Sequence, residues 1–168
     1  MKIIVMSDSH GVFSSVRKVV ERQRDADLFI FLGDGERDIN QILINEPWLE
    51  EKLLCVKGNC DGGMLLSQMK MQLEYTLPYG HKIFAAHGDR YMVKYGAGSM
   101  LQEAKERHAD ILLYGHTHCR EERFEDGVYI LNPGSLGWPR DGKRQSYGVI
   151  SISGQGILTN IADVPTYG

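Results

Sequence analysis

The sequence opens with Met1-Lys-Ile-Ile-Val-Met-Ser-Asp-Ser-His10, in which a short apolar run ends directly in a polar segment. An apolar run of this length, Lys2–Met6, is typical of a strand buried on both faces. Two more such runs follow at Leu28–Leu32 and Leu53–Val56, and each leads into a segment that contains glycine. This spacing predicts parallel strands at the centre of an α/β fold.

The segments between these runs have the pattern of helices. Ser14 and Ser15 are suitable N-caps for a helix that runs to about Arg24, with valines at helical spacing. A second, short helix is expected at Asp38–Leu43, closed by Asn45 and Pro47. The order from the N-terminus is therefore β-α-β-α-β.

The second half of the chain has a different pattern, in which pairs of short strands flank turn residues. A helix at Ser99–His108 and a buried strand at Ile111–Tyr114 interrupt these pairs. The expected hairpins are Gln72–Leu77 with Lys82–Ala86, Arg120–Phe124 with Val128–Leu131, and Ser146–Ser153 with Ile157–Ile161. Two packed sheets covered by helices accommodate both halves. We find no repeats, low-complexity tracts or linkers, which favours a single domain over residues 1–168.

Composition narrows the classes of function. A count of 19 Lys and Arg against 22 Asp and Glu gives a net charge of −3, which argues against a protein that neutralises a long nucleic acid. The three cysteines, Cys55, Cys60 and Cys119, are a poor disulfide framework. The first apolar run is too short for a secretion signal, and no run approaches a membrane span. We therefore expect a cytoplasmic protein that acts without a membrane.

Polar residues follow the expected strands at five points. The segments are Ser7-Asp8-Ser9-His10, Gly33-Asp34, Lys57-Gly58-Asn59-Cys60-Asp61, His87-Gly88-Asp89 and Gly115-His116-Thr117-His118. Ligands of open α/β sheets bind outside the carboxyl ends of strands, and glycine lets the backbone approach closely. Four of the six histidines lie in these segments.

Each segment also has a simpler structural explanation when it is taken alone. Asp8 could cap a helix, Asp34 could serve a turn, and Asn59 tolerates a left-handed backbone. His87 could be a core histidine. The occurrence of all five segments at strand ends favours a site, and imidazole with carboxylate ligands suits Zn, Mn or Fe. The set is large enough for two ions, whose mutual repulsion requires an anionic bridge, for which Asp34 is suited.

The five motifs, in this order and at this spacing, resemble the calcineurin-like metallophosphoesterases over roughly the whole chain. The small size, the Gly58-Asn-Cys-Asp61 form and the later Asn132-Pro-Gly-Ser135 segment resemble the YfcE-like phosphodiesterase branch. The resemblance implies a four-layer α/β/β/α sandwich of two mixed β-sheets flanked by helices. It also implies two divalent ions, with Mn²⁺ expected and Fe, Zn or Ni as variants.

The resemblance assigns roles to particular residues. Asp8, His10 and His118 would hold the first metal, and Asn59, His87 and His116 would hold the second. Asp34 would bridge both, and with Asn59 and His87 it forms the expected catalytic set. The expected activity is that of a metal-dependent phosphodiesterase, in which a metal-bridging hydroxide attacks a small phosphodiester.

The chain departs from the wider family at one position. Cys60 stands where most members have a histidine that assists the leaving group, and a thiol is a poor replacement for an imidazolium. We therefore expect diesters with good leaving groups to react better than alkyl monoesters. Cys60, Asp61 and Arg90 are the expected substrate contacts. Lys94 and Arg140 are further candidates for a phosphate contact, but a solvated surface is the favoured explanation for these two and for Arg90. The segment Asn132–Ser135 is expected to be a tight loop under the site.

Three other functions stay open at this stage. The same fold serves as a protein-interaction scaffold in retromer, where metal ligands are partly lost, but all seven expected ligands are present here. A phosphomonoesterase or phosphoprotein phosphatase is disfavoured by Cys60. A nuclease is disfavoured by the acidic net charge. The sequence leaves open whether the chain forms a homo-oligomer.

Overall fold

The computed structural model describes residues 1–63 and 69–166. In this part of the chain, one five-stranded sheet has the order β10-β9-β1-β2-β3. Its strands are β1 (Lys2–Met6), β2 (Leu28–Phe31), β3 (Leu53–Cys55), β9 (Ser146–Ser153) and β10 (Gly156–Asp163). The three strands β1, β2 and β3 are parallel, as the sequence predicts, while β9 and β10 form the expected antiparallel hairpin beside β1.

The second five-stranded sheet of the described residues has the order β4-β5-β6-β8-β7. Its strands are β4 (Gln72–Thr76), β5 (Lys82–Ala86), β6 (Ile111–Leu113), β7 (Arg120–Glu125) and β8 (Val128–Pro133). Strands β5, β6 and β8 are parallel, and the hairpins β4-β5 and β7-β8 are antiparallel. Both sheets are therefore mixed, in agreement with the expected architecture.

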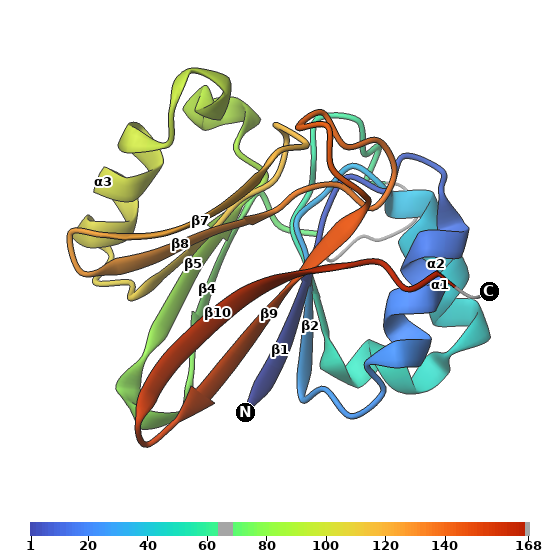
Figure 1. Cartoon of the computed structure of the whole chain (residues 1–168), viewed down its shortest axis with the longest axis horizontal. Coiled ribbons are helices and arrows are strands. Elements are labelled where there is room, and N and C mark those ends of the chain that lie inside the picture. Colours follow the sequence, from blue (N-terminus) through green and yellow to red (C-terminus); the bar gives the residue numbers. More distant parts are fainter. Residues whose placement is uncertain (64–68, 167–168) are drawn as a thin grey trace.

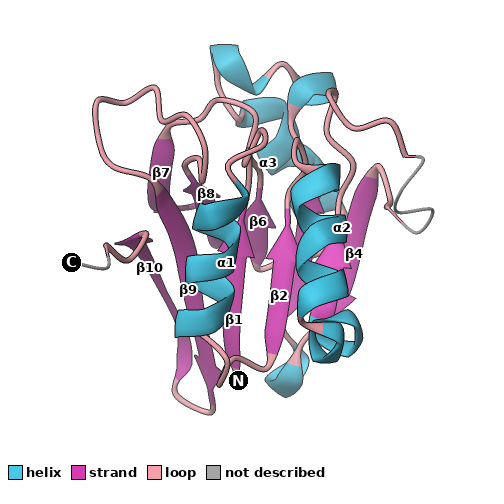
Figure 2. Ribbon diagram, turned by 90° about the vertical axis from the view of Figure 1, so that its right-hand side faces the viewer, coloured by secondary structure: helices cyan, strands magenta, loops and turns pink. Residues whose placement is uncertain are grey.

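Helices cover the outer faces of the two sheets. Figure 1 shows α1 (Phe13–Arg22) and α2 (Glu36–Asn45) outside the first sheet and α3 (Gly98–Glu106) outside the second. In Figure 2, α1 and α2 lie side by side in front of β1 and β2. Short 3₁₀ turns complete the described elements at Pro47–Lys52, Pro78–Gly80, Asp89–Tyr91 and Val93–Tyr95. This is the four-layer α/β/β/α sandwich that the resemblance implies.

Alternation along the strands explains why four layers form. In β1, Ile3 and Val5 face the second sheet, whereas Ile4 and Met6 face α1 and α2, and all four are fully buried. The layer between the sheets is filled by aliphatic side chains such as Ile30, Ile83 and Leu113. The outer face of the second sheet packs against α3. Because β1 is buried on both faces, it has the continuous apolar sequence that opens the chain.

Several predicted boundaries are wrong. Ser14 and Ser15 do not cap α1, because the helix already begins at Phe13 and its N-cap residue, Val12, makes no side-chain cap. Helix α1 ends at Arg22, and α2 is longer than predicted. The segment Asn132–Ser135 is only partly a loop, because Asn132 and Pro133 are the last residues of β8.

No helix among the described residues is long and apolar enough to cross a membrane.

Candidate metal centre

The loops that follow β1, β2, β5 and β6 bring carboxylates and imidazoles from both sheets to one place. Asp8, His10 and His118 form a first ligand group, whose ligand atoms all lie within 4.8 Å of one another. Asp34, His87 and His116 form a second ligand group by the same measure. Each group takes residues from both sheets, so the site lies where the strand ends of the two sheets meet. The sequence places all six of these residues correctly at strand ends.

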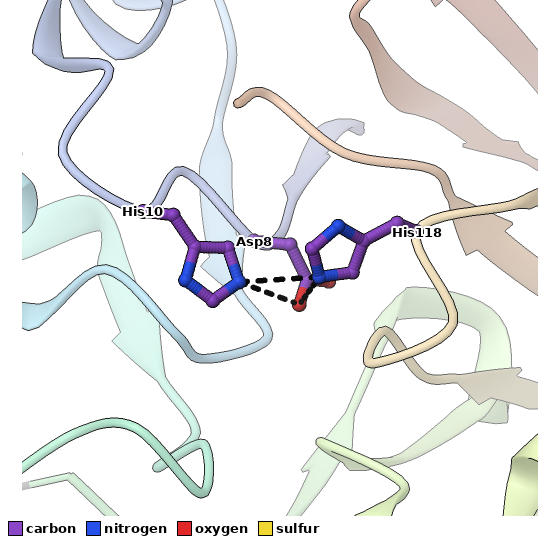
Figure 3. A group of neighbouring side chains, drawn as sticks. All are labelled: Asp8, His10 and His118. Carbon is purple, nitrogen blue, oxygen red and sulfur yellow. Dashed lines mark hydrogen bonds and ion pairs between the residues drawn. The ribbon is translucent and has the colours of Figure 1, made fainter. Parts of the chain in front are cut away.

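The first ligand group converges on one carboxylate oxygen. Asp8 Oδ1 lies 3.2 Å from His118 Nε2 and 3.7 Å from His10 Nε2, and the two imidazole nitrogens are 3.1 Å apart. Figure 3 shows both imidazoles turned toward the carboxylate of Asp8. The other oxygen, Oδ2, accepts hydrogen bonds from Ser7 Oγ and the His116 backbone. Asp8 is therefore held by Oδ2 and presents Oδ1 to the imidazoles.

Asp8 Oδ1 provides the test of whether this site fits a metal ion. It is buried and accepts no hydrogen bond from any described residue, an arrangement that is costly for a carboxylate unless a cation or donor compensates it. Burial opposes ionisation, but His10 and His118 hold the pKa of Asp8 well below its usual value. An ionised, buried carboxylate oxygen and the two imidazoles that it faces together form a donor set for a divalent ion. Asp8, His10 and His118 therefore fit a metal ion.

Asp34 connects the two ligand groups. Its Oδ2 lies 3.3 Å from His87 Nε2 in the second group and 3.7 Å from His10 Nε2 in the first. Its Oδ1 accepts a hydrogen bond from the Cys60 backbone at 2.8 Å. Burial opposes ionisation here too, while His87 lowers the pKa of Asp34. This position is the one that a bridging carboxylate requires.

Backbone carbonyls fix which imidazole nitrogen faces the centre. His87 Nδ1 lies 2.7 Å from the Leu32 carbonyl oxygen, and His118 Nδ1 lies 2.7 Å from that of Trp138. A proton on Nδ1 satisfies each carbonyl and leaves Nε2 to bind a cation. Burial disfavours a charged His87, but Asp34 and Asp8 raise the pKa of His87 to about 9. The carboxylates therefore create a local demand for positive charge.

Cys60 belongs to a third group of ligand atoms, with His10 and Asp34. Burial, followed by the hydrogen bond and charge of Asp34, raises the pKa of the Cys60 thiol to about 11. Asn59 Nδ2 donates to Cys60 Sγ at 3.3 Å. Asn59 is exposed, and its binding to the second metal stays a prediction.

The carboxylate of Asp61 is occupied by hydrogen bonds within the protein, unlike that of a residue that contacts substrate. It is 8% exposed, and its two carboxylate oxygens accept hydrogen bonds from four backbone N–H groups at 2.8–2.9 Å. Three of these donors follow β2, at residues 34–36, and the fourth is Gly58 N, which follows β3. The carboxylate therefore clamps two ligand loops together. Its predicted contact with substrate is untested, and this geometry favours a positioning role.

Arg90 lies on the rim of a hollow of about 310 Å³ that His87, Met71 and Tyr91 also line. It is exposed, and its predicted role as a substrate contact stays a prediction. Ser135, in the segment expected under the site, donates to the Asp8 carbonyl at 2.7 Å. Asn132 donates to the Gly115 carbonyl at 3.0 Å. These two residues brace the loops of the ligands without reaching the centre.

Sequence reasoning missed the residues that orient the ligands. Ser7 lies inside a quoted motif, but nothing in its spacing reveals that its hydroxyl holds Asp8. The carbonyls of Leu32 and Trp138 leave no trace in residue type.

Comparison with known proteins agrees with this geometry. Residues 1–155 match the calcineurin-like phosphoesterase superfamily domain. The phosphodiesterase YfcE of Escherichia coli (strain K12) is 27% identical over 192 residues, covering 98% of this chain and all of that protein. A predicted phosphoesterase from Streptococcus pneumoniae TIGR4 has a similar structure, with a TM-score of 0.79 and 30% identity, covering 96% of this chain and 88% of the other.

The fold alone is shared more widely. Vps29 from Entamoeba histolytica, solved in complex with zinc, aligns with a TM-score of 0.71 and 19% identity over 98% of this chain and 100% of that chain. Taken together, the matches show that this chain belongs to the calcineurin-like phosphoesterase superfamily, a family of metal-dependent phosphoesterases.

Proposed function

We propose that this protein is a dinuclear-metal phosphodiesterase that hydrolyses small phosphodiesters. The observation that carries the proposal is the position of Asp34 Oδ2 between His10 of the first ligand group and His87 of the second. Two separate ion sites would not need a carboxylate at this point, whereas a two-metal centre does. The proposal assigns the activity to residues 1–168 acting as one domain, and it is supported by the phosphodiesterase named among the relatives.

Seven residues of the chain would bind the two metal ions of such a centre. Asp8, His10 and His118 would hold one ion, Asn59, His87 and His116 the other, and Asp34 both. When bound, the ions supply Lewis-acid stabilisation of the phosphoryl oxygens and a water of lowered pKa. We propose Mn²⁺ as the native metal, because the donors are carboxylate, amide and imidazole groups.

Cys60 determines the preference between substrate classes. Its thiol, with a pKa raised to about 11, is a much weaker acid than an imidazolium. A leaving group that needs protonation therefore receives little help from this position. A diester with an acidic leaving alcohol needs none, so diesters of this kind are the substrates that the site supports best.

Metal analysis combined with a matched pair of esters tests the proposal. Protein stripped with a chelator and reloaded should hold about two Mn²⁺ per chain. It should hydrolyse bis(p-nitrophenyl) phosphate faster than p-nitrophenyl phosphate. Asp34→Asn and His116→Ala should each lose metal and turnover, while Asp25→Asn, on the surface, should change neither.

The alternatives predict different results. A preference for the monoester would favour a phosphomonoesterase, and normal turnover and metal content in both ligand variants would contradict the two-metal centre. A protein that takes up no metal and hydrolyses neither ester would favour the scaffold role that the fold of Vps29 suggests.

A further inference from the structure

A hollow of about 680 Å³ opens beside the ligand groups on the side of α2. His10, Asp34 and Cys60 line it, so it communicates with the centre itself. Its wall continues along the first turn of α2, which supplies Arg37. A phosphodiester carries two substituents on the reacting phosphorus, and this hollow has room for one of them.

The carboxylates of this wall are already satisfied by the protein. Asp61 accepts four backbone N–H groups, as described above. Asp38 accepts hydrogen bonds from Ser9 Oγ at 2.6 Å and Gly11 N at 2.9 Å. Glu36 accepts one from Gly63 N at 3.0 Å. All three side chains belong to buried residues, so their oxygens already have donors within the protein and are not presented to a bound molecule.

Arg37, unlike these carboxylates, has a charged side chain without a partner among the described residues. It is exposed and makes no hydrogen bond or ion pair with any residue that the structure describes. Its guanidinium is always charged and has a planar fork of donors that matches a phosphate or carboxylate. Among the described residues that line this wall, Arg37 is therefore the one exposed and unpaired charge, and it lies beside the proposed centre for phosphate esters.

We propose that Arg37 is a specificity-determining residue that binds a second oxyanion, a phosphate or a carboxylate, carried by one substituent of the diester. This inference rests on the proposed phosphodiesterase function and narrows it to diesters with an additional negative group. Ions held by the two ligand groups would neutralise the reacting phosphoryl group, which would leave Arg37 free for the second anion.

Two matched pairs of chromogenic esters test this. The first pair is thymidine 5′-(p-nitrophenyl phosphate) and its 3′-phosphorylated form, and the second is butyl and carboxypropyl p-nitrophenyl phosphate. The wild-type, Mn²⁺-loaded protein should show a kcat/KM about tenfold higher for the anionic member of at least one pair, as a charge-assisted fork contact implies. The pair that shows the preference identifies phosphate or carboxylate.

Variants locate the effect at Arg37. Arg37→Gln should reduce the preference to about onefold, and Arg37→Lys should restore part of it because the charge returns without the fork. Arg22→Gln, in the last turn of α1, removes the same charge elsewhere and should keep the full preference. Equal kcat/KM within both pairs in the wild type, or a preference that survives in Arg37→Gln, would overturn the inference.

A binding measurement separates this inference from the function on which it rests. Calorimetry with thymidine 3′,5′-bisphosphate and thymidine 5′-phosphate should show about tenfold tighter binding of the bisphosphate, lost in Arg37→Gln. If neither ester pair is hydrolysed but this difference is present, the phosphodiesterase proposal fails and the anion site stands. If the esters are hydrolysed without discrimination and the two nucleotides bind equally, the anion site fails alone.

Discussion

The proposed ligands have an unusual backbone at the scale of single residues. Asp8, His10, Asp34, His116 and His118 all have positive φ, between 44° and 66°. Side chains with a Cβ rarely adopt this region, and when they do the strain is compensated by surrounding structure. Here the compensation is visible in the hydrogen bonds from Ser7, Cys60 and Ser135 to the two carboxylate-bearing residues. We therefore expect small changes around these loops to affect metal binding.

Asp8→Asn tests the buried, unpaired oxygen directly. The amide keeps the size of the side chain but removes the charge that faces His10 and His118. We expect metal affinity to fall by at least about tenfold, as happens when even indirect supports of a metal ligand are lost. Metal titration followed by elemental analysis measures this. Asp27→Asn, on the surface, is the control, and equal metal content in both variants would contradict the role of Asp8.

Asp61→Ala tests the clamp between the loops that follow β2 and β3. The substitution leaves four backbone N–H donors without their acceptor in a buried place. We expect a loss of about 2–4 kcal/mol in the free energy of unfolding, together with weaker metal binding. Urea denaturation measures the first effect. Retained stability with a loss of diesterase turnover alone would instead support the substrate contact that the sequence predicted for Asp61.

At the scale of helices and strands, the sequence predicts the buried strands and the hairpins but not every helix end. The apolar runs predict β1, β2 and β6 because strands buried on both faces leave an unmistakable pattern, and turn residues predict the hairpins β4-β5 and β9-β10. The predicted start of α1 is wrong because a tertiary contact holds the chain just before the helix. Asp38 accepts a hydrogen bond from Gly11 N across 27 residues, so the chain turns into the helix without a serine cap.

The site shows the same division between local and long-range information. The gathering of Asp8, Asp34 and the four histidines was predictable, because each follows a strand and their chemistry is distinctive. Their supports were not, because Ser7, Asp61 and the Trp138 carbonyl act through contacts that residue type does not encode. The pairing of β1 with β9 likewise joins residues about 145 positions apart in sequence, a distance over which local patterns carry no information.

Helix α2 offers a matched pair of isoleucines at the scale of one element. Ile42 is fully buried against the first sheet, whereas Ile44 is 70% exposed on the same helix. Ile42→Ala should cost about 2–4 kcal/mol in unfolding free energy through lost burial and the cavity left behind. Ile44→Ala should cost less than about 0.5 kcal/mol. Equal losses in urea denaturation would contradict the packing of Ile42 against the first sheet.

The packing of α2 should also affect metal binding. The helix begins at Glu36, two residues after Asp34, so its packing positions the bridging carboxylate and Arg37 alike. An Ile42→Ala protein that remains folded should therefore bind metal less tightly than Ile44→Ala. Metal titration of the two variants below their unfolding transitions measures this coupling.

At the scale of the whole molecule, the proposed centre ties the two sheets together. Asp8, His10 and Asp34 come from loops of the first sheet, and His87, His116 and His118 come from loops of the second. An ion held by residues of both sheets binds the folded state and loses its site when the sheets separate. Metal binding should therefore stabilise the whole fold by mass action, in addition to enabling the reaction.

This gives a prediction with a definite size. At a free Mn²⁺ concentration about 100 times the dissociation constant, one bound ion stabilises the fold by about 2.7 kcal/mol. For a chain of this length, that raises the Tm by about 5–10 °C. Thermal unfolding with and without a chelator measures the shift. Because Asp34 contributes to both ligand groups, Asp34→Asn should lose most of it, whereas Asp25→Asn should keep all of it. A shift of equal size in Asp34→Asn would mean that the ion stabilises the protein elsewhere, and that the junction of the two sheets is not where the metal is held.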